Sequence, residues 1–251
     1  MRLPLFPLHA VLFPHLPLPL HVFEERYRAM TSDLVADGSP WGGRVVVTMI
    51  TAGSEVERGP RAASPPPHAH PTRAHRVGTI AEVRHAEQFA DGRWAMLTVG
   101  VERVELGPTD LSGEYAVVEA EALPEVVGDA HAASQLLPDV QVALDRYLET
   151  VKHLVASTAS VGRDTQEISR MTASLDEVLK PFRLPDDPLA ASYAIGGMLQ
   201  IELARKQHLL ELPDAVSRLR AELDLLRREA RLLGEGSMPP LGANDLRYNP
   251  N

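Results

Sequence analysis

The chain has 251 residues, 44% of them hydrophobic and 24% charged, which is the composition of a globular protein with one large domain or two small ones. The absence of cysteine excludes disulfides, iron–sulfur clusters, thiolate zinc sites and cysteine nucleophiles. The formal net charge of -9 disfavours binding to nucleic acid, because an acidic surface repels the phosphate backbone.

The N-terminal segment is apolar, but its five prolines between Pro4 and Pro19 are incompatible with a signal-peptide helix or a membrane-spanning helix. We therefore expect a cytoplasmic protein that does not enter a membrane. Prolines recur through residues 12–20, which is typical of extended edge segments and bends. Residues 21–30 then change to a helical spacing, in which Phe23, Tyr27 and Met30 share one face.

The following hundred residues contain apolar or alternating runs that predict β-strands. An Asp-Gly turn at residues 91–92 separates two of these runs. Residues 58–76 are rich in proline, histidine and arginine and have no apolar period, which predicts a long mobile loop. The predicted strands are residues 44–50, 77–83, 94–99, 101–106 and 115–122.

The remainder of the chain predicts helices. Residues 128–134 are a predicted linker, and helical spacing begins at Val140. A short helix is predicted over residues 174–179, and a longer one from the Asp187–Pro188 start signal to about residue 212, with Gly196 and Gly197 as its weak point. The last predicted helix covers residues 214–233.

That last helix has a heptad-like apolar seam, which predicts packing either within the bundle or against a second copy of the chain. A homodimer through residues 216–233 is one of the two expectations. The seam consists of Val216, Leu219, Leu223, Leu226, Ala230 and Leu233.

Strands followed by helices predict an α+β fold. We expect a β-rich domain at residues 1–127, a helical bundle at residues 128–233 and a flexible polar tail at residues 234–251.

Four N-terminal stretches form a specific pattern, residues 3–8 (LPLFPL), 11–14 (VLFP), 18–24 (LPLHVFE) and 26–30 (RYRAM). This pattern resembles the start of the N-terminal domain of Lon proteases. Weaker matches follow in order at residues 41–42, 77–79, 91–93, 100–103 and Tyr115, and then at residues 187–188 and 206–211. The resemblance covers nearly the whole chain.

This resemblance implies a small PUA-like β-barrel or sheet domain followed by a helical bundle, which in Lon proteases recognises substrates. The sequence departs from the family at two places. His15 stands where the family usually has glycine, so we expect the turn there to differ in geometry. The loop at residues 58–76 is also longer than the resemblance predicts.

Seven residues in the most family-specific stretches are candidates for polypeptide binding or for a structural role. We expect the aromatic residues to be mainly core, and Glu24 and Arg26 to form a structural ion pair, because a buried unpaired charge is costly. The candidates are Phe13, Pro14, Phe23, Glu24, Arg26, Tyr27 and Trp41.

The sequence offers little that predicts catalysis. It has no G-x-x-x-x-G-K-[ST] phosphate loop and no G-x-S-x-G motif, and we expect no ATPase or protease domain. The three lysines, Lys152, Lys180 and Lys206, have no local arrangement that predicts a lowered pKa. Histidines in the 58–76 loop lack a carboxylate between them, so we expect no metal site and no cofactor.

Arginines and acidic residues alternate along the last two predicted helices. Pairs such as Arg218 with Glu222 and Asp224 with Arg228 have i,i+4 spacing, which predicts a solvated helix face rather than an RNA-binding face.

These observations together predict a non-catalytic module that binds unfolded polypeptide or a specific protein partner, as an adaptor in protein quality control. The alternative is a PUA-like RNA-binding protein, which the acidic charge disfavours. A hydrolase is a third hypothesis, which no motif supports.

Overall fold

The computed structural model describes residues 1–52, 73–159 and 182–234, with no side chains described for residues 155–159. The chain packs into two compact units. Of the described residues, the first unit contains those of Met1–Glu125 together with Gly196–Leu212, and the second contains those of Val126–Ile195 together with residues 213–234. The predicted helix at residues 174–179, most of the predicted 58–76 loop and the tail after residue 234 lie outside the described residues.

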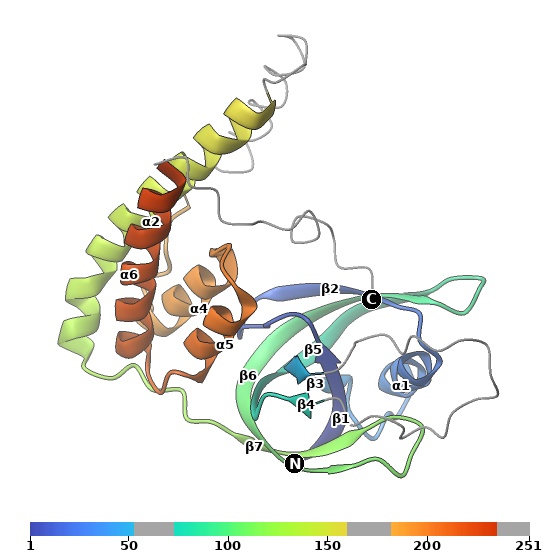
Figure 1. The fold of residues 1–251 in the computed structure, drawn as a ribbon. Helices are drawn as coiled ribbons and strands as arrows, with labels where there is room; N and C mark the ends of the chain where they lie inside the picture. The colour runs from blue at the N-terminus through green and yellow to red at the C-terminus, as the bar shows by residue number, and fades with distance from the viewer. Residues whose placement is uncertain (53–72, 160–181, 235–251) are drawn as a thin grey trace. The chain divides into compact units, whose positions relative to one another are not determined.

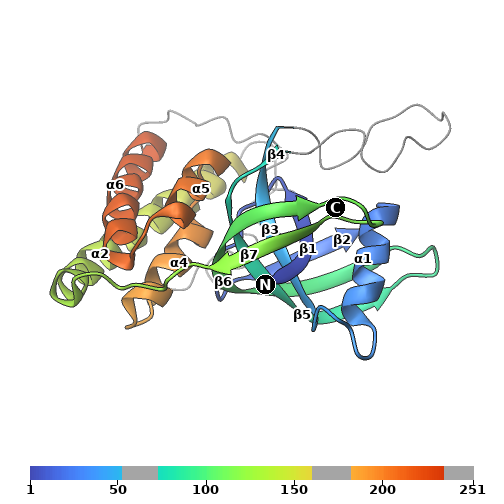
Figure 2. The same cartoon turned by 90° about the horizontal axis from the view of Figure 1, so that it is seen from below.

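The strands of the first unit close into a barrel. β1 pairs with β7, β7 with β6, β6 with β5, β5 with β3, and β3 in parallel with β1, so the ring has no open end. Figures 1 and 2 show these strands winding around a common centre. The strands are β1 Arg2–Leu8, β2 Pro17–Val22, β3 Arg44–Ala52, β4 Arg73–Ala74, β5 Val77–Gln88, β6 Trp94–Asp110 and β7 Val117–Ala122.

Two apolar cores lie on opposite faces of the same strands. On β3, Val46 belongs to the barrel core, while Val45 and Val47 belong to a second core beneath helix α1 (Glu25–Val35). Burial on both faces explains why β3 is a continuous apolar run instead of an alternating one. Figures 1 and 2 show α1 lying beside β2, where it contributes Tyr27, Met30 and Leu34 to the second core.

The structure confirms the α+β prediction, a β-barrel domain with helices in the C-terminal part, but it corrects several element bounds. The helix predicted at residues 21–30 begins at Glu25, because His21 and Val22 pair with β6 as the end of β2. The sequence also gave no sign of β1, whose prolines occupy buried positions.

Residues 94–99 and 101–106 were predicted as two strands and form the single strand β6. Gly100 lies at the point where they join. A Cβ on Gly100 would lie 2.4 Å from the carbonyl oxygen of Phe13, so glycine is needed there to admit the turn that precedes β2. The glycine that suggested a break in the strand is therefore a site of close packing.

The single helix predicted from residue 188 to about 212 is also two helices, α4 (Pro188–Met198) and α5 (Leu203–Glu211). The break follows the two predicted weak-point glycines. A Cβ on Gly196 would lie 2.7 Å from the ring of Phe13, so this part of the chain packs tightly against the first unit to which it belongs.

Arg103 fastens α5 to the barrel. Its side chain is 2% exposed, and its Nη1 donates to the carbonyl oxygens of Leu210 and Leu212 at 2.9 and 2.7 Å. Nη2 donates to the Pro124 carbonyl at 3.1 Å, and Nε lies 3.4 Å from Glu125 Oε1. A buried guanidinium is stable here because carbonyl and carboxylate oxygens replace its water.

The second unit is built around α2 (Ala130–Ala159) and α6 (Ala215–Gly234). Helix α2 begins ten residues before the predicted Val140. Asp187 and Asp214 accept backbone hydrogen bonds from Ala190 and Ser217 at 2.9 and 2.7 Å, as helix N-caps do.

The apolar seam of α6 packs inside this unit. Val216, Leu219, Leu223, Leu226 and Ala230 are all buried, and α6 packs along α2. The sequence predicted that the seam packs either within the bundle or against a second copy of the chain, and the structure shows packing within the bundle.

The prediction of a solvated charged face is wrong for one row of α6. Arg218 and Glu222 are fully buried, and Glu229 is nearly so. Arg218 Nη1 donates to Ser192 Oγ at 2.8 Å, and its guanidinium lies 4.4 Å above the Tyr193 ring. Because i,i+4 spacing is the same for buried and exposed pairs, it does not reveal which face of a helix is covered.

Candidate functional site

β2, the first half of β6 and the second half of β5 form a three-stranded arm of the sheet. Pro19 pairs with Leu97 and Leu97 with His85, and two residues away His21 pairs with Ala95 and Ala95 with Glu87. Because side chains alternate between the faces of a sheet, the register assigns these residues to one face and Leu20, Val22 and Met96 to the other.

The two faces of the arm have opposite surroundings. The inner face, which includes Leu20, Val22 and Met96, is buried in the core beneath α1. The other face is open and still mostly apolar, with Leu97 39% exposed. We call it the outer face, and it consists of Pro17, Pro19, His21, Ala95, Leu97 and Val99.

Aromatic rings gather where β2 ends. The His21 ring lies 5.9 Å from Phe89 in an edge-on arrangement and 6.5 Å from Phe23. Phe89 is 40% exposed and Phe23 is half-buried. These rings extend the apolar surface beyond the last residue pair of the arm.

Few charges interrupt this surface. On β5, Glu82 and Glu87 flank it, and Arg84 is held by Glu82 at 2.9 Å. The outer face therefore offers apolar contact with an acidic border, which suits apolar or mildly basic segments better than a phosphate backbone.

The structure does not bring the seven predicted residues into one site. Phe13, Pro14 and Tyr27 are buried, and Tyr27 packs 4.5 Å from Phe6 in the core beneath α1. Phe23, Glu24, Arg26 and Trp41 are half-buried, and only Phe23 extends the outer face.

Glu24 and Arg26 form the ion pair that the sequence predicted, with Arg26 Nη2 3.1 Å from Glu24 Oε2. The guanidinium of Arg26 also lies 4.5 Å above the Tyr27 ring. The cavity beside them has a volume of about 10 Å³, which is too small for a side chain. Both residues thus anchor the start of α1.

Trp41 belongs to a polar chain at the edge of the core. Its Nε1 donates to Tyr115 Oη at 3.0 Å, and Tyr115 donates to Asp33 Oδ2 at 2.5 Å. Burial, together with the hydrogen bond to Asp33, raises the pKa of Tyr115 to about 12. These two hydrogen bonds join α1, which contains Asp33, to the two loops that contain Trp41 and Tyr115.

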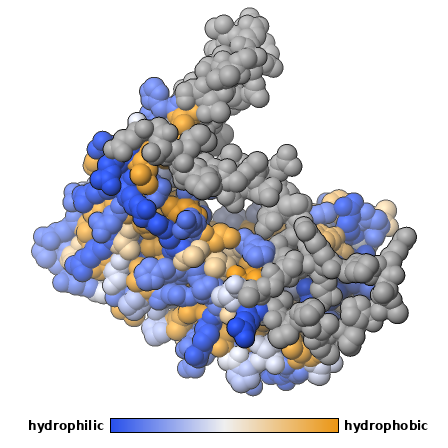
Figure 3. All heavy atoms as spheres, viewed as in Figure 1, coloured by the Kyte–Doolittle hydropathy of each residue, from blue (hydrophilic) through white to orange (hydrophobic). Residues whose placement is uncertain are grey.

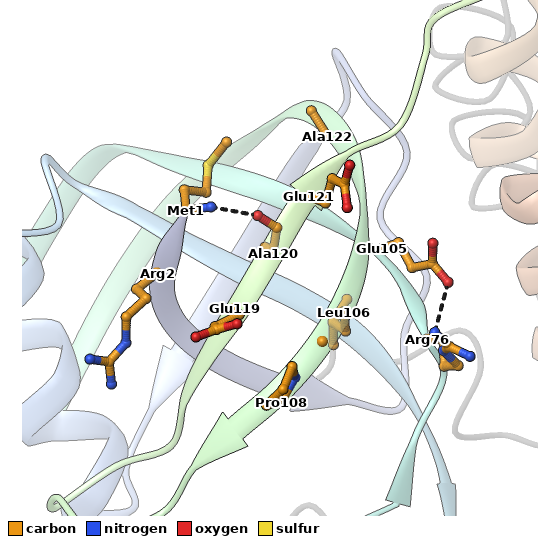
Figure 4. Close-up of a pocket in the computed structure, with 11 residues that line it drawn as sticks. Met1, Arg2, Arg76, Glu105, Leu106, Pro108, Glu119, Ala120, Glu121 and Ala122 are labelled. Atoms are coloured by element: carbon orange, nitrogen blue, oxygen red, sulfur yellow. Dashed lines mark hydrogen bonds and ion pairs between the residues drawn. The ribbon is translucent and has the colours of Figure 1, made fainter.

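A pocket of about 660 Å³ lies over β6 and β7 (Figure 4). Arg76 Nη2 pairs with Glu105 Oε1 at 3.0 Å in its wall, and the Met1 amino group donates to the Ala120 carbonyl at 2.7 Å. The lining contains no serine, histidine or lysine, so it holds no serine or lysine nucleophile and no histidine base. It consists of Met1, Arg2, Arg76, Glu105, Leu106, Gly107, Pro108, Glu119, Ala120, Glu121 and Ala122.

The expectation of unperturbed lysines is wrong for Lys206. Burial lowers its pKa to about 8, and its Nζ donates to the Gly197 carbonyl at 3.1 Å. Lys152 pairs with Glu149 at 2.9 Å, and Lys180 lies outside the described residues. The Lys206 amine therefore holds the end of α4 and contacts a carbonyl instead of a hydroxyl.

Histidine does not assemble a metal site in residues 1–52, 73–159 and 182–234, where no three histidine or acidic side chains lie close enough to hold an ion. His75 Nδ1 lies 3.1 Å from Glu211 Oε1, and His68 and His70 lie outside the described residues.

Sequence reasoning missed the outer face, although a signal for it exists. In residues 94–100 (WAMLTVG) neither alternating set is charged, so neither face of that strand is marked as solvent-facing. A strand that is uncharged on both faces and lies beside a proline-rich edge strand indicates a second buried or binding surface.

The viewed face of the helices shows no comparable surface. In Figure 3, apolar residues on the helices are interspersed with polar ones. Among the described residues, no helix is both long enough and apolar enough to cross a membrane.

Comparison with protein families gives a match to the ATP-dependent protease La (LON) substrate-binding domain over residues 2–228. Similar curated proteins include Lon protease 2 of Syntrophobacter fumaroxidans, 23% identical over 220 residues, which are 87% of this chain and 23% of that protein. Lon protease of Escherichia coli is 24% identical over 241 residues, covering 92% of this chain and 26% of that protein. The chain spans about a quarter of the length of these relatives.

Two solved structures have the same fold. The N-terminal domain of a Mycobacterium avium complex Lon protease matches 90% of this chain and 98% of that one, with a TM-score of 0.53 and 17% identity. A Lon N-terminal domain protein from Xanthomonas campestris matches 89% of this chain and 98% of that one, with a TM-score of 0.51 and 20% identity.

Proposed function

Because the chain belongs to the family of LON substrate-binding domains, we propose that it is a non-catalytic module that binds unfolded polypeptide. The observation that carries the proposal is the outer face, an exposed apolar surface on strands whose opposite face packs into the core beneath α1. Apolar area that does not contribute to the core is typical of a surface that meets a partner.

Six of the seven predicted residues take a structural role in this proposal and one a binding role. Phe13, Pro14 and Tyr27 support the strands from within, and Phe23 extends the binding surface beside His21. Glu24 and Arg26 fix the start of α1, and Trp41 fixes the loops next to it. This assignment of structural and binding roles agrees with the burial of the seven predicted residues, none of which is fully exposed.

Fluorescence anisotropy with a labelled, unstructured, apolar peptide tests the proposal. We expect micromolar affinity, and no binding at about 100 µM would contradict it. Leu97→Asp is expected to weaken binding at least about tenfold, because a carboxylate would have to lose its water on contact with the peptide.

A matched control is available in the same unit. Leu111 is 41% exposed, against 39% for Leu97, but lies outside the arm. Leu111→Asp should leave the affinity unchanged within about twofold, since it alters net charge and exposed apolar area equally without touching the outer face. Equal losses for both variants would show that binding is not located on the arm.

The absence of catalysis is part of the proposal. The family matched is a substrate-binding domain, and the lining of the pocket over β6 and β7 contains no serine, histidine or lysine. Incubation with casein, with and without ATP, should yield no cleavage products; cleavage that co-purifies with the chain through two columns would overturn this part.

We further propose an adaptor role, in which the bound polypeptide is passed to a protease. Addition of the chain to a cytoplasmic ATP-dependent protease should accelerate degradation of the peptide-bearing substrate, and Leu97→Asp should not. A homodimer through α6 would have to use its exposed residues, because its seam is already covered. Light scattering that shows a monomer would remove that arrangement.

A further inference from the structure

The second edge of β2 lacks most of the N–H donors that strand addition uses. Within the described part of the chain β2 pairs with β6 alone, so no described strand pairs with its other edge. An open edge normally pairs with an extended peptide, through alternating N–H donors and carbonyl acceptors. How a polypeptide can bind the arm therefore depends on which residues direct their backbone N–H and carbonyl groups toward that edge.

The register shows that two prolines point there. The carbonyl of Leu16 accepts from Gly100 N at 2.9 Å, and that of Leu18 accepts from Thr98 Oγ1 at 3.0 Å, so both face β6. Backbone groups alternate in direction along a strand, so the residues between and beyond them, Pro17, Pro19 and His21, face the open edge.

Proline has no N–H, so two of the three donors on this edge are missing. A peptide that paired with β2 would find one donor, at His21, where a regular edge of this length has three. The side chains of the same three residues lie on the outer face, next to Ala95, Leu97 and Val99. The edge thus keeps its carbonyl acceptors but has too few donors for a regular ladder, while the adjoining face is open to apolar side chains.

We infer that the arm recognises the side chains of an unfolded chain and is indifferent to its backbone hydrogen-bonding groups. This inference rests on the proposed function and adds the class of ligand. The ligand is any exposed apolar segment, whether extended, turned or interrupted by proline, and not a segment selected for forming a β-strand.

Backbone esters provide the test. An ester in place of an amide removes the N–H, weakens the carbonyl oxygen as an acceptor and keeps the trans geometry. An apolar peptide with esters at alternate residues is therefore impaired in both kinds of backbone hydrogen bond, while its side chains are unchanged. We expect the amide and ester peptides to bind within about twofold of each other by anisotropy. A loss of tenfold or more for the ester peptide would overturn the inference.

A variant tests the cause. Pro17→Thr with Pro19→Thr restores two donors to the edge, and we expect this double variant to bind the amide peptide at least about fivefold better than the ester peptide. Circular dichroism and size-exclusion chromatography confirm that the variant is folded and monomeric. If it is not, the ester comparison on the unaltered chain still decides the question.

Failure of the inference and failure of the proposed function give different results. If the proposed function is wrong, neither peptide binds, or Leu97→Asp leaves binding unchanged. If the inference alone is wrong, the amide peptide binds, Leu97→Asp abolishes that binding, and the ester peptide does not bind.

Discussion

The two faces of the β2–β6–β5 arm are built by the same strands from similar residues, and only one of them contributes to the core. Met96 on the inner face is 3% exposed and its neighbour Leu97 on the outer face is 39% exposed. Burial of apolar area stabilises a fold in proportion to the area removed from water, so the outer residues contribute little to stability. The comparison teaches that stability and binding can be divided between adjacent residues of one strand.

The largest effect that tests this comparison is on the inner face. Met96→Ala leaves a cavity in the core beneath α1 and should lower the free energy of unfolding by about 2–4 kcal/mol. Leu97→Ala, the matched change on the outer face, should lower it by less than about 1 kcal/mol while weakening peptide binding. Urea unfolding and anisotropy on both variants measure the division; equal losses of stability would end the distinction between the faces.

A residue that lies on neither face of the arm, Lys206, provides a test in which stability should change and peptide binding should not. Lys206 has a folded pKa of about 8, below the ordinary value of 10.5, so the unfolded chain holds more protons between these two pH values. Stability should therefore rise as the pH increases from 8 to 10.5, and the charged amine is a cost at pH 7.

Lys206→Met removes that cost, together with the hydrogen bond to Gly197, and should stabilise the protein by about 1–2 kcal/mol at pH 7. Its unfolding free energy should no longer rise between pH 8 and 10.5. Peptide affinity should not follow the gain in stability, because Lys206 lies on neither face of the arm. A variant that is less stable than the parent chain at pH 7 would contradict the expectation.

A smaller effect is expected where the inner core meets Trp41. The folded pKa of Tyr115, about 12, lies above its ordinary value of 10.0, so the fold favours the neutral phenol. The resulting stability is complete below pH 10 and is lost as the pH rises through 12. Tyr115→Phe should reduce the alkaline loss of stability, as measured by urea titrations at pH 9 and 11; an unchanged difference would show that the hydrogen bond to Asp33 is too exposed to matter.

The smallest effect concerns the turn that leads into the arm. His15 has φ of 67°, in the left-handed region that favours glycine, so the turn keeps a backbone that glycine adopts readily. The expectation that this turn differs in geometry from that of the family stays a prediction. His15→Gly should relieve the strain, offset by greater freedom in the unfolded chain, and raise the free energy of unfolding by about 0.5 kcal/mol. A thermal scan that shows a lower midpoint would contradict this.

Much of the fold follows from local patterns, and what was missed depends on long-range contacts. The apolar run of β3, the Asp-Gly turn before β6 and the Asp187–Pro188 helix start all carry local signals, and the structure contains each of them. Gly100 and Gly196 could not be interpreted from the sequence, because each is explained by the approach of Phe13, which lies far away in the chain.

The candidate site was less predictable than the fold for the same reason. Phe13 and Phe23 are both phenylalanines in family-specific segments, yet one is 1% exposed and the other is half-buried beside the outer face. Nothing local distinguishes them. The outer face is defined by the register between β2 and β6, which joins residues about eighty positions apart.

Arg103 has a consequence for how such a domain can diverge. Three of the groups that receive its guanidinium are main-chain carbonyls, of Leu210, Leu212 and Pro124, and every amino acid supplies that oxygen. Mutation at those three positions therefore leaves the acceptors in place, whereas replacement of Arg103 would leave all three carbonyl oxygens without this donor. Arg103 is one of the side chains that hold the α5 segment against the barrel, and the residues that accept its hydrogen bonds can change while the acceptor oxygens remain.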